Sequence, residues 1–368
     1  MAADREPAAW GIAALAGDPR LRRILLMTFG LALVVRVGWV LVRHGGGHPP
    51  EPYPDESAYW LSARALACGQ GLQDEFGFRA TYMPAYPAFL SLFVPLERAA
   101  LWAGLAQAVL AAGLAPATAV LAVRFLAWSD GPAADAGESR RSAPAAAAAG
   151  MAAALDPFLV YFSGLFLTEA VFASALVAAW AVLSGPSTGS GARPMRDGLV
   201  AGLLLLACVM LRPSGLFLAA AGAWVLILRH GLRRGSGGAA TLTAVVAAGL
   251  LPWALRNQQV VGQRVWLTTR GGISLYDGFR PGADGGSDLA HTKRMPEIRG
   301  LGEPAWDAFF RRRAVEAVKA DPGRAVRLAG AKFLRTWSPR PNVETCLLYT
   351  SDAADDLLCV DLGGRRII

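Results

Sequence analysis

The chain has 368 residues, of which 54% are hydrophobic and only 17% are charged. Soluble domains carry about 25% charged residues, so this composition excludes an ordinary soluble protein. The formal net charge of +8 is one mark of a nucleic-acid-binding chain. Most arginines, however, fall in short connections between long apolar runs, as in loops retained at the cytoplasmic face of a membrane. The sequence therefore predicts an all-α polytopic membrane protein.

Seven apolar runs are predicted to cross the bilayer as helices. They span residues 24–42, 100–126, 145–167, 170–183, 198–211, 216–228 and 239–255. Arg20, Arg22 and Arg23 precede the first run, so the positive-inside rule places the N-terminal residues 1–23 in the cytoplasm. Every even-numbered run then leads into an arginine-bearing loop on that same side. Pro157 is expected to kink the third run.

Residues 43–99 form a long loop that this orientation places outside the cytoplasm. Within the loop, residues 57–68 have the pattern of a helix, for which Ser57 is a candidate N-cap. Residues 81–96 are apolar but contain three prolines. We therefore expect there a helix lying in the membrane interface rather than a further span.

Two adjacent carboxylates, Asp55 and Glu56, stand beyond the first span, where Pro52 and Pro54 stiffen the chain. A rigid acidic pair at the membrane surface favours proton abstraction or cation binding. The alternative is a solvated loop that carries ordinary charges.

The pattern changes beyond residue 256. Residues 265–269 and 273–276 are rich in strand-forming side chains, and Arg270-Gly271-Gly272 between them is typical of a hairpin turn. Two helix candidates follow, at 306–320 and 324–337. Residues 257–345 are thus predicted to form a small extracytoplasmic α/β segment with a hairpin and helices.

The glycine-rich loop 277–288 lacks the ligand spacing of an EF-hand, so we interpret it as a flexible lid rather than a calcium loop. His44 and His48 lie in a Gly/Pro-rich stretch and are assigned no metal. Residues 346–368 differ abruptly in composition and look like read-through of a sequencing adaptor. That interpretation predicts a natural chain that continues beyond Thr345, and the alternative is a short disordered tail.

Several short motifs follow one another at the outer ends of the predicted spans, over residues 24–340. They are Asp55-Glu56 with Tyr59, Ala65 with Gly69 to Gly71, Met83-Pro84-Ala85-Tyr86-Pro87, Thr168-Glu169, Leu211-Arg212-Pro213, Pro252-Trp253-Ala254-Leu255-Arg256-Asn257, and Gly271-Gly272 with Leu275-Tyr276. Together they resemble the membrane glycosyltransferases of the GT-C fold. That group contains dolichyl-phosphate-mannose protein mannosyltransferases, aminoarabinose transferases and lipopolysaccharide-core galacturonosyltransferase-like enzymes. The chain departs from the pattern at Gly278-Phe279, where the family often has Gly-Asn.

The resemblance implies that residues 24–256 form a GT-C-like transmembrane domain in a bacterial plasma membrane. It also implies transfer of a sugar, with inversion, from a polyprenyl-phosphate donor to an extracytoplasmic lipid, glycan or protein. Further spans of the family would follow residue 345. The acceptor hydroxyl of such a reaction needs a base, for which Asp55 is the candidate. Glu56 and Glu169 are the other candidate catalytic carboxylates, and a divalent cation bridging the three is left open.

The departing lipid phosphate needs cations, and the planar guanidinium of arginine suits phosphate oxygens. Arg256, Arg212 and Arg36 are the candidates, with headgroup anchoring as the alternative for the first two. Because Arg36 lies inside the first span, we expect it to face the bundle interior and a carboxylate or phosphate.

Tyr59, Tyr82 and Tyr86 are expected to line the substrate cavity, and the alternative is an interfacial aromatic belt. Two other functions stay open at this stage. One is a lipid or solute transporter or flippase that uses the same charged cavity. The other is a non-catalytic membrane subunit.

Overall fold

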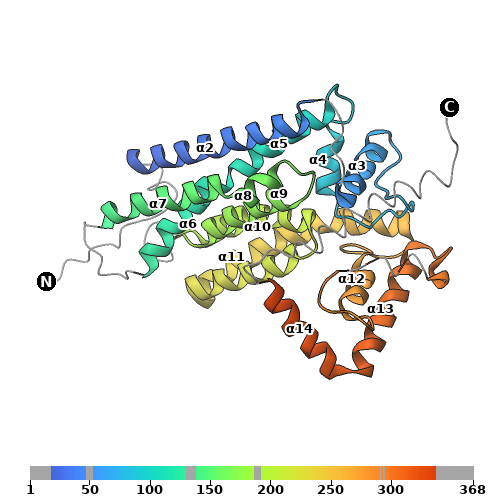
Figure 1. Ribbon diagram of the computed structural model, residues 1–368. Helices are drawn as coiled ribbons and strands as arrows, with labels where there is room; N and C mark the ends of the chain where they lie inside the picture. Colours follow the sequence, from blue (N-terminus) through green and yellow to red (C-terminus); the bar gives the residue numbers. More distant parts are fainter. Residues whose placement is uncertain are drawn as a thin grey trace. The chain divides into compact units, whose positions relative to one another are not determined.

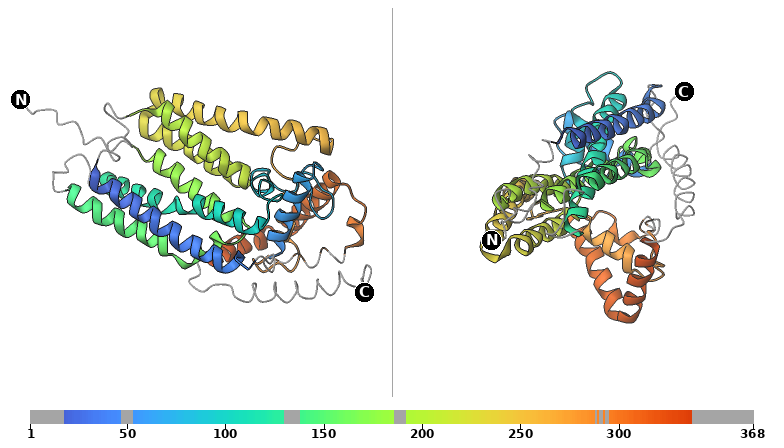
Figure 2. Two further views of the ribbon diagram at one scale, coloured as in Figure 1. Left: turned by 90° about the horizontal axis from the view of Figure 1, so that it is seen from above. Right: turned by 90° about the vertical axis from the view of Figure 1, so that its left-hand side faces the viewer.

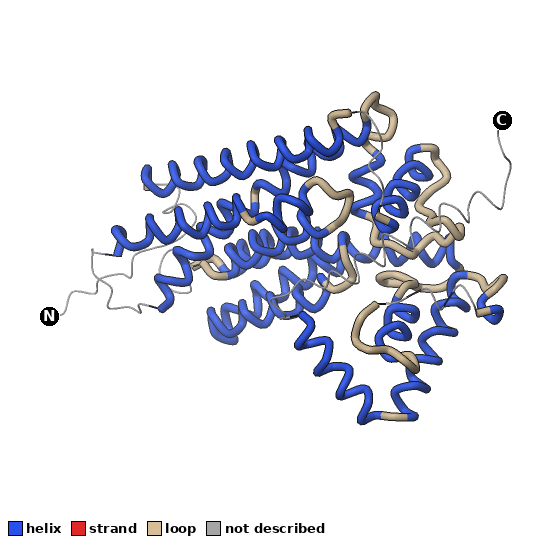
Figure 3. The backbone as a smooth tube through the Cα atoms, viewed as in Figure 1, coloured by secondary structure: helices blue, strands red, loops and turns tan. Residues whose placement is uncertain are grey.

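The computed structural model describes residues 18–46, 53–129, 138–185, 192–287, 289, 292 and 295–336. Every regular element among these residues is helical, and Figure 3 shows helices joined by loops. The all-α prediction is therefore confirmed for this part of the chain. Residues 1–17, His48 and the unusual segment 346–368 lie outside the described residues.

The chain divides into two compact units. The bundle unit comprises the described residues of Met1–Glu51, Tyr59–Leu72 and Met83–Arg256. The C-terminal unit comprises those of Pro52–Ala58, Gln73–Tyr82 and Asn257–Ile368. The predicted extracytoplasmic loop 43–99 thus contributes residues to both units.

Apolar helices, most of them long, make up the bundle unit (Figure 1). They are α2 (Pro19–His44), α5 (Ala99–Ala112), α6 (Leu114–Ser129), α7 (Glu138–Leu155), α8 (Pro157–Ser163), α9 (Glu169–Leu183), α10 (Pro194–Leu211) and most of α11 (Gly215–Val261), joined by most of α3 (Pro54–Ala67) and by α4 (Ala85–Ser91). Helix α7 packs against α2 and α6, and α9 packs against α6 and α10. Alanines dominate the core between α2, α5, α6 and α7, because small side chains let helix backbones approach closely in a membrane.

Several of these helices are suited to a bilayer. By length and apolar composition, four stretches of the described chain can cross a membrane: Pro19–His44, Ala99–Ala127, Pro194–Leu211 and Gly215–Val261. A fifth is obtained if the bent pair Ser142–Leu155 and Pro157–Ser163 counts as one span. These helices mark a membrane-embedded protein.

Helix α11 contains the sixth and seventh predicted runs. It breaks at Gly231, whose φ of 74° is open to glycine. The two halves fold back on each other, since a Cβ on Gly222 would lie 3.4 Å from the Leu242 side chain. Figure 2 shows the two yellow helices side by side.

The third predicted run is broken where the sequence indicates. Helix α7 ends at Leu155, α8 begins at Pro157, and the two are bent by 51°. Pro157 has no N–H, so it cannot donate to the Ala153 carbonyl four residues earlier. The kink therefore leaves carbonyl groups without helical partners inside an apolar bundle, where each unpaired group is costly.

Arg36 of α2 supplies the missing donors. Its side chain is fully buried, with Nη1 3.0 Å from the Ala154 carbonyl oxygen and Nη2 3.1 Å from that of Ala153. Arg36 thus faces the bundle interior as predicted. Its hydrogen bonds go to backbone carbonyls at the kink rather than to a carboxylate or phosphate, and the carboxylate of Asp156 at the kink attracts it electrostatically.

The same face of α2 binds the chain beyond the kink. Trp39 Nε1 donates to the Tyr161 carbonyl oxygen at 3.1 Å, and His44 Nε2 lies 2.8 Å from that of Gly164. From α5, Gln107 Nε2 donates to the carbonyls of Ser163 and Leu165 at 2.9 and 2.6 Å. Side chains of two helices therefore fix the path of residues 153–165 up to the start of α9.

Replacing Arg36 with Met should destabilise the bundle, because two buried carbonyls lose their donors, at about 1–3 kcal/mol each. The measurement is the Tm of the detergent-purified protein, with Arg23→Met, at an exposed position of the same helix, as the control. An unchanged Tm for Arg36→Met would show that removing a buried charge offsets the lost hydrogen bonds.

Four helical elements make up most of the C-terminal unit. They are α12 (Gly271–Phe279), the 3-10 helix η2 (Pro296–Ile298), α13 (Glu303–Ala320) and α14 (Pro322–Thr336). The two predicted helices at 306–320 and 324–337 correspond to α13 and α14. The predicted hairpin over 265–276 is wrong, because residues 271–279 form a helix.

Close packing explains why the glycine pair does not form a turn. A Cβ on Gly272 would lie 2.1 Å from the Asp307 carbonyl oxygen, so only glycine lets α12 approach α13 this closely. The Gly272 N–H donates to Asp307 Oδ1 at 2.5 Å, which caps the start of α12. Ile273 and Tyr276 then share one buried face against Phe310. Packing at helical spacing overrides the strand propensity of these residues.

Two buried carboxylates hold segment 73–82 within the C-terminal unit. Glu303 accepts the N–H groups of Arg79 and Ala80 at 2.7 Å each and the Thr269 hydroxyl at 2.5 Å. Asp74 Oδ1 accepts two backbone N–H groups of its own turn, and its Oδ2 accepts the Thr81 hydroxyl at 2.7 Å. Both carboxylates are therefore occupied by structural hydrogen bonds.

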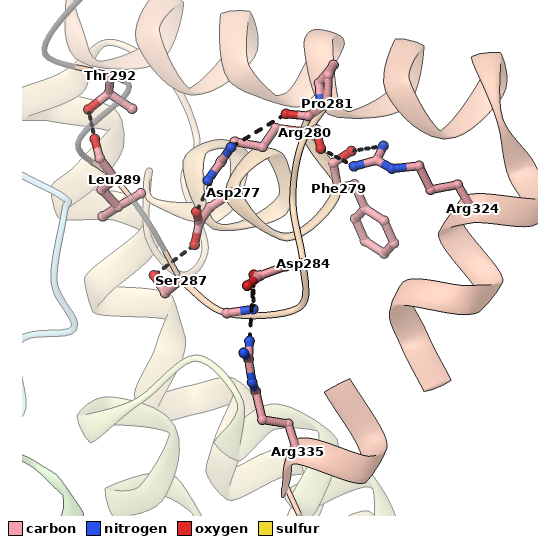
Figure 4. Close-up of polar contacts among 11 residues, drawn as sticks. Asp277, Phe279, Arg280, Pro281, Asp284, Ser287, Leu289, Thr292, Arg324 and Arg335 are labelled. Carbon is pink, nitrogen blue, oxygen red and sulfur yellow. Dashed lines mark hydrogen bonds and ion pairs between the residues drawn. The ribbon is translucent and has the colours of Figure 1, made fainter. Parts of the chain in front are cut away.

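The glycine-rich stretch after α12 is tied back to its own unit (Figure 4). Asp277 belongs to α12, and its Oδ2 accepts the Ser287 hydroxyl at 2.8 Å. Asp284 accepts the Gly286 N–H at 2.8 Å and lies 3.6 Å from Arg335. The Gly286 hydrogen bond, and secondarily Arg335, hold the pKa of Asp284 below its ordinary value. These contacts do not test whether the loop moves, so the flexible lid stays a prediction. Asp288 lies outside the described residues.

Glu303→Gln should loosen segment 73–82, because glutamine replaces one accepting carboxylate oxygen with an NH₂ group. That NH₂ group is itself a donor and cannot accept the N–H of Arg79 or Ala80. A lost hydrogen bond to a charged group is worth about 1.5–3 kcal/mol. Hydrogen–deuterium exchange of peptides covering 73–82 should accelerate, while peptides of α5 should not change. Glu316→Gln, at an exposed position of the same helix, is the matched control; equal exchange in both variants would contradict this assignment.

Candidate functional site

The acidic pair lies in the first turn of α3. This helix begins at Pro54, a residue suited to a first helical position because its missing N–H is not needed there. Ser57 is therefore inside the helix, so its expected role as the N-cap is wrong. The predicted helix at 57–68 is confirmed but starts earlier. Of the apolar run 81–96, only Ala85–Ser91 is helical, as α4.

Asp55 and Glu56 differ in environment although they are adjacent. Glu56 is 2% exposed, and its Oε2 accepts the Tyr53 N–H at 3.3 Å. A glutamate three residues beyond the N-cap that bonds back to it is half of a capping box. Asp55 is exposed at the positive end of the helix dipole. Asp55 is thus accessible to a substrate, whereas Glu56 stabilises the helix start.

Glu169 and Arg212 form an ion pair in the bundle unit. Glu169 is the first residue of α9, and Arg212 follows the last residue of α10. Arg212 Nη1 lies 2.6 Å from Glu169 Oε1, and the two side chains are 41% and 39% exposed. Each charge also suits its helix end, since carboxylates favour helix N-termini and cations favour C-termini. The pair is accessible to a charged ligand from solvent.

An aromatic cluster lies beside this ion pair. Arg212 stands over the ring of Phe172 at 6.0 Å, and Phe172 packs with the cluster formed by Tyr59, Trp60, Tyr86, Phe89 and Phe166. Tyr59 and Tyr86 meet edge to face with ring centroids 5.1 Å apart. The structure thus places Tyr59 and Tyr86 in one cluster beside the Glu169–Arg212 pair. Tyr86 is 1% exposed, so the expected lining of a substrate cavity by these tyrosines stays a prediction.

Gln107 was not predicted from the sequence. It is fully buried, and its Oε1 accepts the Tyr86 hydroxyl at 2.6 Å while its amide binds the chain just before Glu169. The only signal was a single amide inside an apolar run. Since a buried polar group needs partners, that amide could have been identified as a positioning residue but not assigned to a partner.

Arg256 and Tyr82 have separate partners. Arg256 Nη2 donates to the Leu72 carbonyl oxygen at 3.3 Å, and its guanidinium lies 5.1 Å from the Trp253 ring centroid. In the C-terminal unit, the Tyr82 hydroxyl accepts from Arg270 Nη1 at 2.7 Å. Arg270 also lies over the Tyr82 ring at 5.2 Å.

The predicted site residues therefore fall into three groups. Glu169, Arg212, Tyr59, Tyr86 and Arg256 belong to the bundle unit; Asp55, Glu56 and Tyr82 belong to the C-terminal unit; Arg36 is used at the kink. Convergence of the first two groups on one cavity stays a prediction. Among the described residues, no group of three or more His, Cys, Asp or Glu side chains could hold a metal ion.

Comparison with known proteins returned no match to a family model, a curated protein or a solved structure. The functional interpretation therefore rests on the residues themselves and on the motif resemblance noted above.

The ion pair should contribute little to folding. Pairs this exposed are worth about 0.2–1 kcal/mol. We therefore expect Glu169→Gln, Arg212→Gln and the double variant to unfold within a few degrees of the natural chain. The measurement is a double-mutant cycle on Tm in detergent. A coupling well above this range would identify the pair as a structural element of the bundle instead.

Proposed function

We propose that the protein is a membrane glycosyltransferase that moves a sugar from a polyprenyl-phosphate donor to an extracytoplasmic lipid, glycan or protein. The observation that supports this best is the exposed Glu169–Arg212 pair beside an aromatic cluster in a membrane-embedded bundle. A guanidinium over the ring of Phe172, at the edge of an apolar and aromatic cluster, suits a lipid-linked phosphate, which has an anionic head and an apolar tail.

The proposed reaction is a displacement at the anomeric carbon. The acceptor oxygen forms a bond to this carbon while the bond to the phosphate oxygen breaks, and the polyprenyl phosphate leaves with the electron pair. Asp55 takes the proton of the acceptor hydroxyl. Arg212 and Arg256 bind the departing phosphate, because its negative charge increases in the transition state. Attack opposite the leaving group gives inversion.

The proposed side of the membrane rests on the two ends of α9, which packs against α10, one of the helices long enough to cross a membrane. Glu169 begins this helix, whereas Arg229 donates to the carbonyls of Leu183 and Gly185 at its other end. Arg229 is followed by His230, Arg233 and Arg234, a basic group that the positive-inside rule assigns to the cytoplasm. Glu169 and Arg212 would then face the extracytoplasmic side of a bacterial plasma membrane, in a bundle of about seven spans.

Asp55 and Glu56 provide a matched test of the base. Asp55→Asn should lower transfer by about 10²–10⁴-fold, the usual contribution of a general base. Glu56→Gln should retain activity, because glutamine also completes a capping box. The assay follows labelled sugar from polyprenyl phosphate into extractable product in membranes that contain each variant. Full activity of Asp55→Asn would remove Asp55 as the base.

Arg212→Gln should lower the rate by about 10²–10³-fold, as removal of one transition-state charge donor does. Arg264→Gln, at an exposed position, is the control. Flux of labelled lipid-linked sugar across vesicles without transfer would instead identify a transporter or flippase. Absence of both activities in the complete, folded protein would favour a non-catalytic subunit.

A further inference from the structure

Helix α14 turns its basic side toward its own unit (Figure 4). Arg324 donates to the carbonyl oxygens of Phe279 and Arg280, and Arg335 lies 3.6 Å from Asp284. Between them, Leu328 is 6% exposed. The face that packs inward thus contains most of the positive charge of the helix.

The opposite face of α14 is apolar and exposed. Val326, Phe333 and Leu334 are 73%, 64% and 71% exposed, and the exposed Ala329 and Gly330 lie between them. These positions follow the spacing i, i+3, i+4, i+7 and i+8, which places them on one continuous stripe. We refer to these five residues as the outer stripe.

This arrangement is the reverse of that in a water-exposed amphipathic helix, which buries its apolar face. A continuous exposed apolar surface marks an interaction site. The partner must be apolar where it meets the outer stripe. It should also tolerate positive charge at its edge, because Arg327 borders the stripe, is 72% exposed and reaches Asp321 at 3.5 Å.

A lipid surface has both properties, with an acyl layer for the stripe and anionic headgroups for arginine. Helix α14 carries no Asp or Glu between Pro322 and Thr336, so no carboxylate within the helix repels such a surface. Lipid is also the apolar partner that surrounds this protein, whose other helices are suited to cross a membrane.

We propose that α14 is a membrane-surface helix, with Val326, Phe333 and Leu334 inserted into the headgroup–acyl boundary and Arg327 at the phosphate level. This inference does not depend on the proposed glycosyltransferase activity. It assigns the outer stripe to anionic lipid rather than to a second protein.

Spin labels on the full chain in nanodiscs of anionic lipid test the proposal. Single cysteines replace Val326, Phe333 or Leu334 in a chain whose four native cysteines are changed to alanine. Accessibility to oxygen, which concentrates in lipid, is compared with accessibility to a water-soluble nickel chelate. Ala331→Cys, on the inward face, and Arg311→Cys, at a position 60% exposed on α13, are the controls.

All three stripe positions should be accessible to oxygen and protected from the chelate. The Arg311 position should show the reverse, and the Ala331 position should be protected from both reagents. Arg327→Gln, or exchange of anionic for zwitterionic lipid, should increase chelate accessibility at the stripe. Stripe labels that behave like the Arg311 label would place the stripe in water. Labels protected from both reagents would indicate a protein cover, and either result would overturn the proposal.

Discussion

The bundle depends on one constraint: backbone carbonyls freed by a break in an apolar helix must find donors where no water is available. The break at Pro157 creates this need, and α2 meets it with Arg36, Trp39 and His44 on one face. Gln107 of α5 completes the set. A fully buried arginine in a span suggested chemistry, but here it secures the path of the backbone.

The candidate site follows from that path. Residues 153–165 are fixed on both sides of the kink, so the start of α9 is fixed as well, and Glu169 stands there opposite Arg212. The Gln107 side chain binds both this segment and Tyr86. The hydrogen bonds that satisfy the backbone therefore also position the charges and aromatic rings from which the proposed donor site is built.

Carboxylates in this chain serve two different purposes. Glu56, Asp74 and Glu303 are buried and accept backbone N–H groups, which fix a helix start and segment 73–82. Asp55 is exposed at a helix N-terminus, and the Glu169 side chain is 39% exposed at another. The distinction is one of burial and partners, since a carboxylate occupied by backbone donors has little capacity left to accept a substrate proton.

The sequence by itself determined the helical, membrane-embedded class of the bundle, the kink at Pro157 and the change of pattern beyond residue 256. Composition and hydrophobic spacing are local properties, so they can be interpreted without coordinates. Only the tertiary structure decided that Gly271-Gly272 is a helix contact rather than a hairpin, and that Glu56 caps a helix. It also decided that Arg36 binds carbonyls and that Glu169 meets Arg212, 43 residues away. The Glu56 cap is local, since its partner Tyr53 lies three residues away. The other outcomes depend on which distant groups come into contact, and neither propensity nor spacing along the chain contains that information.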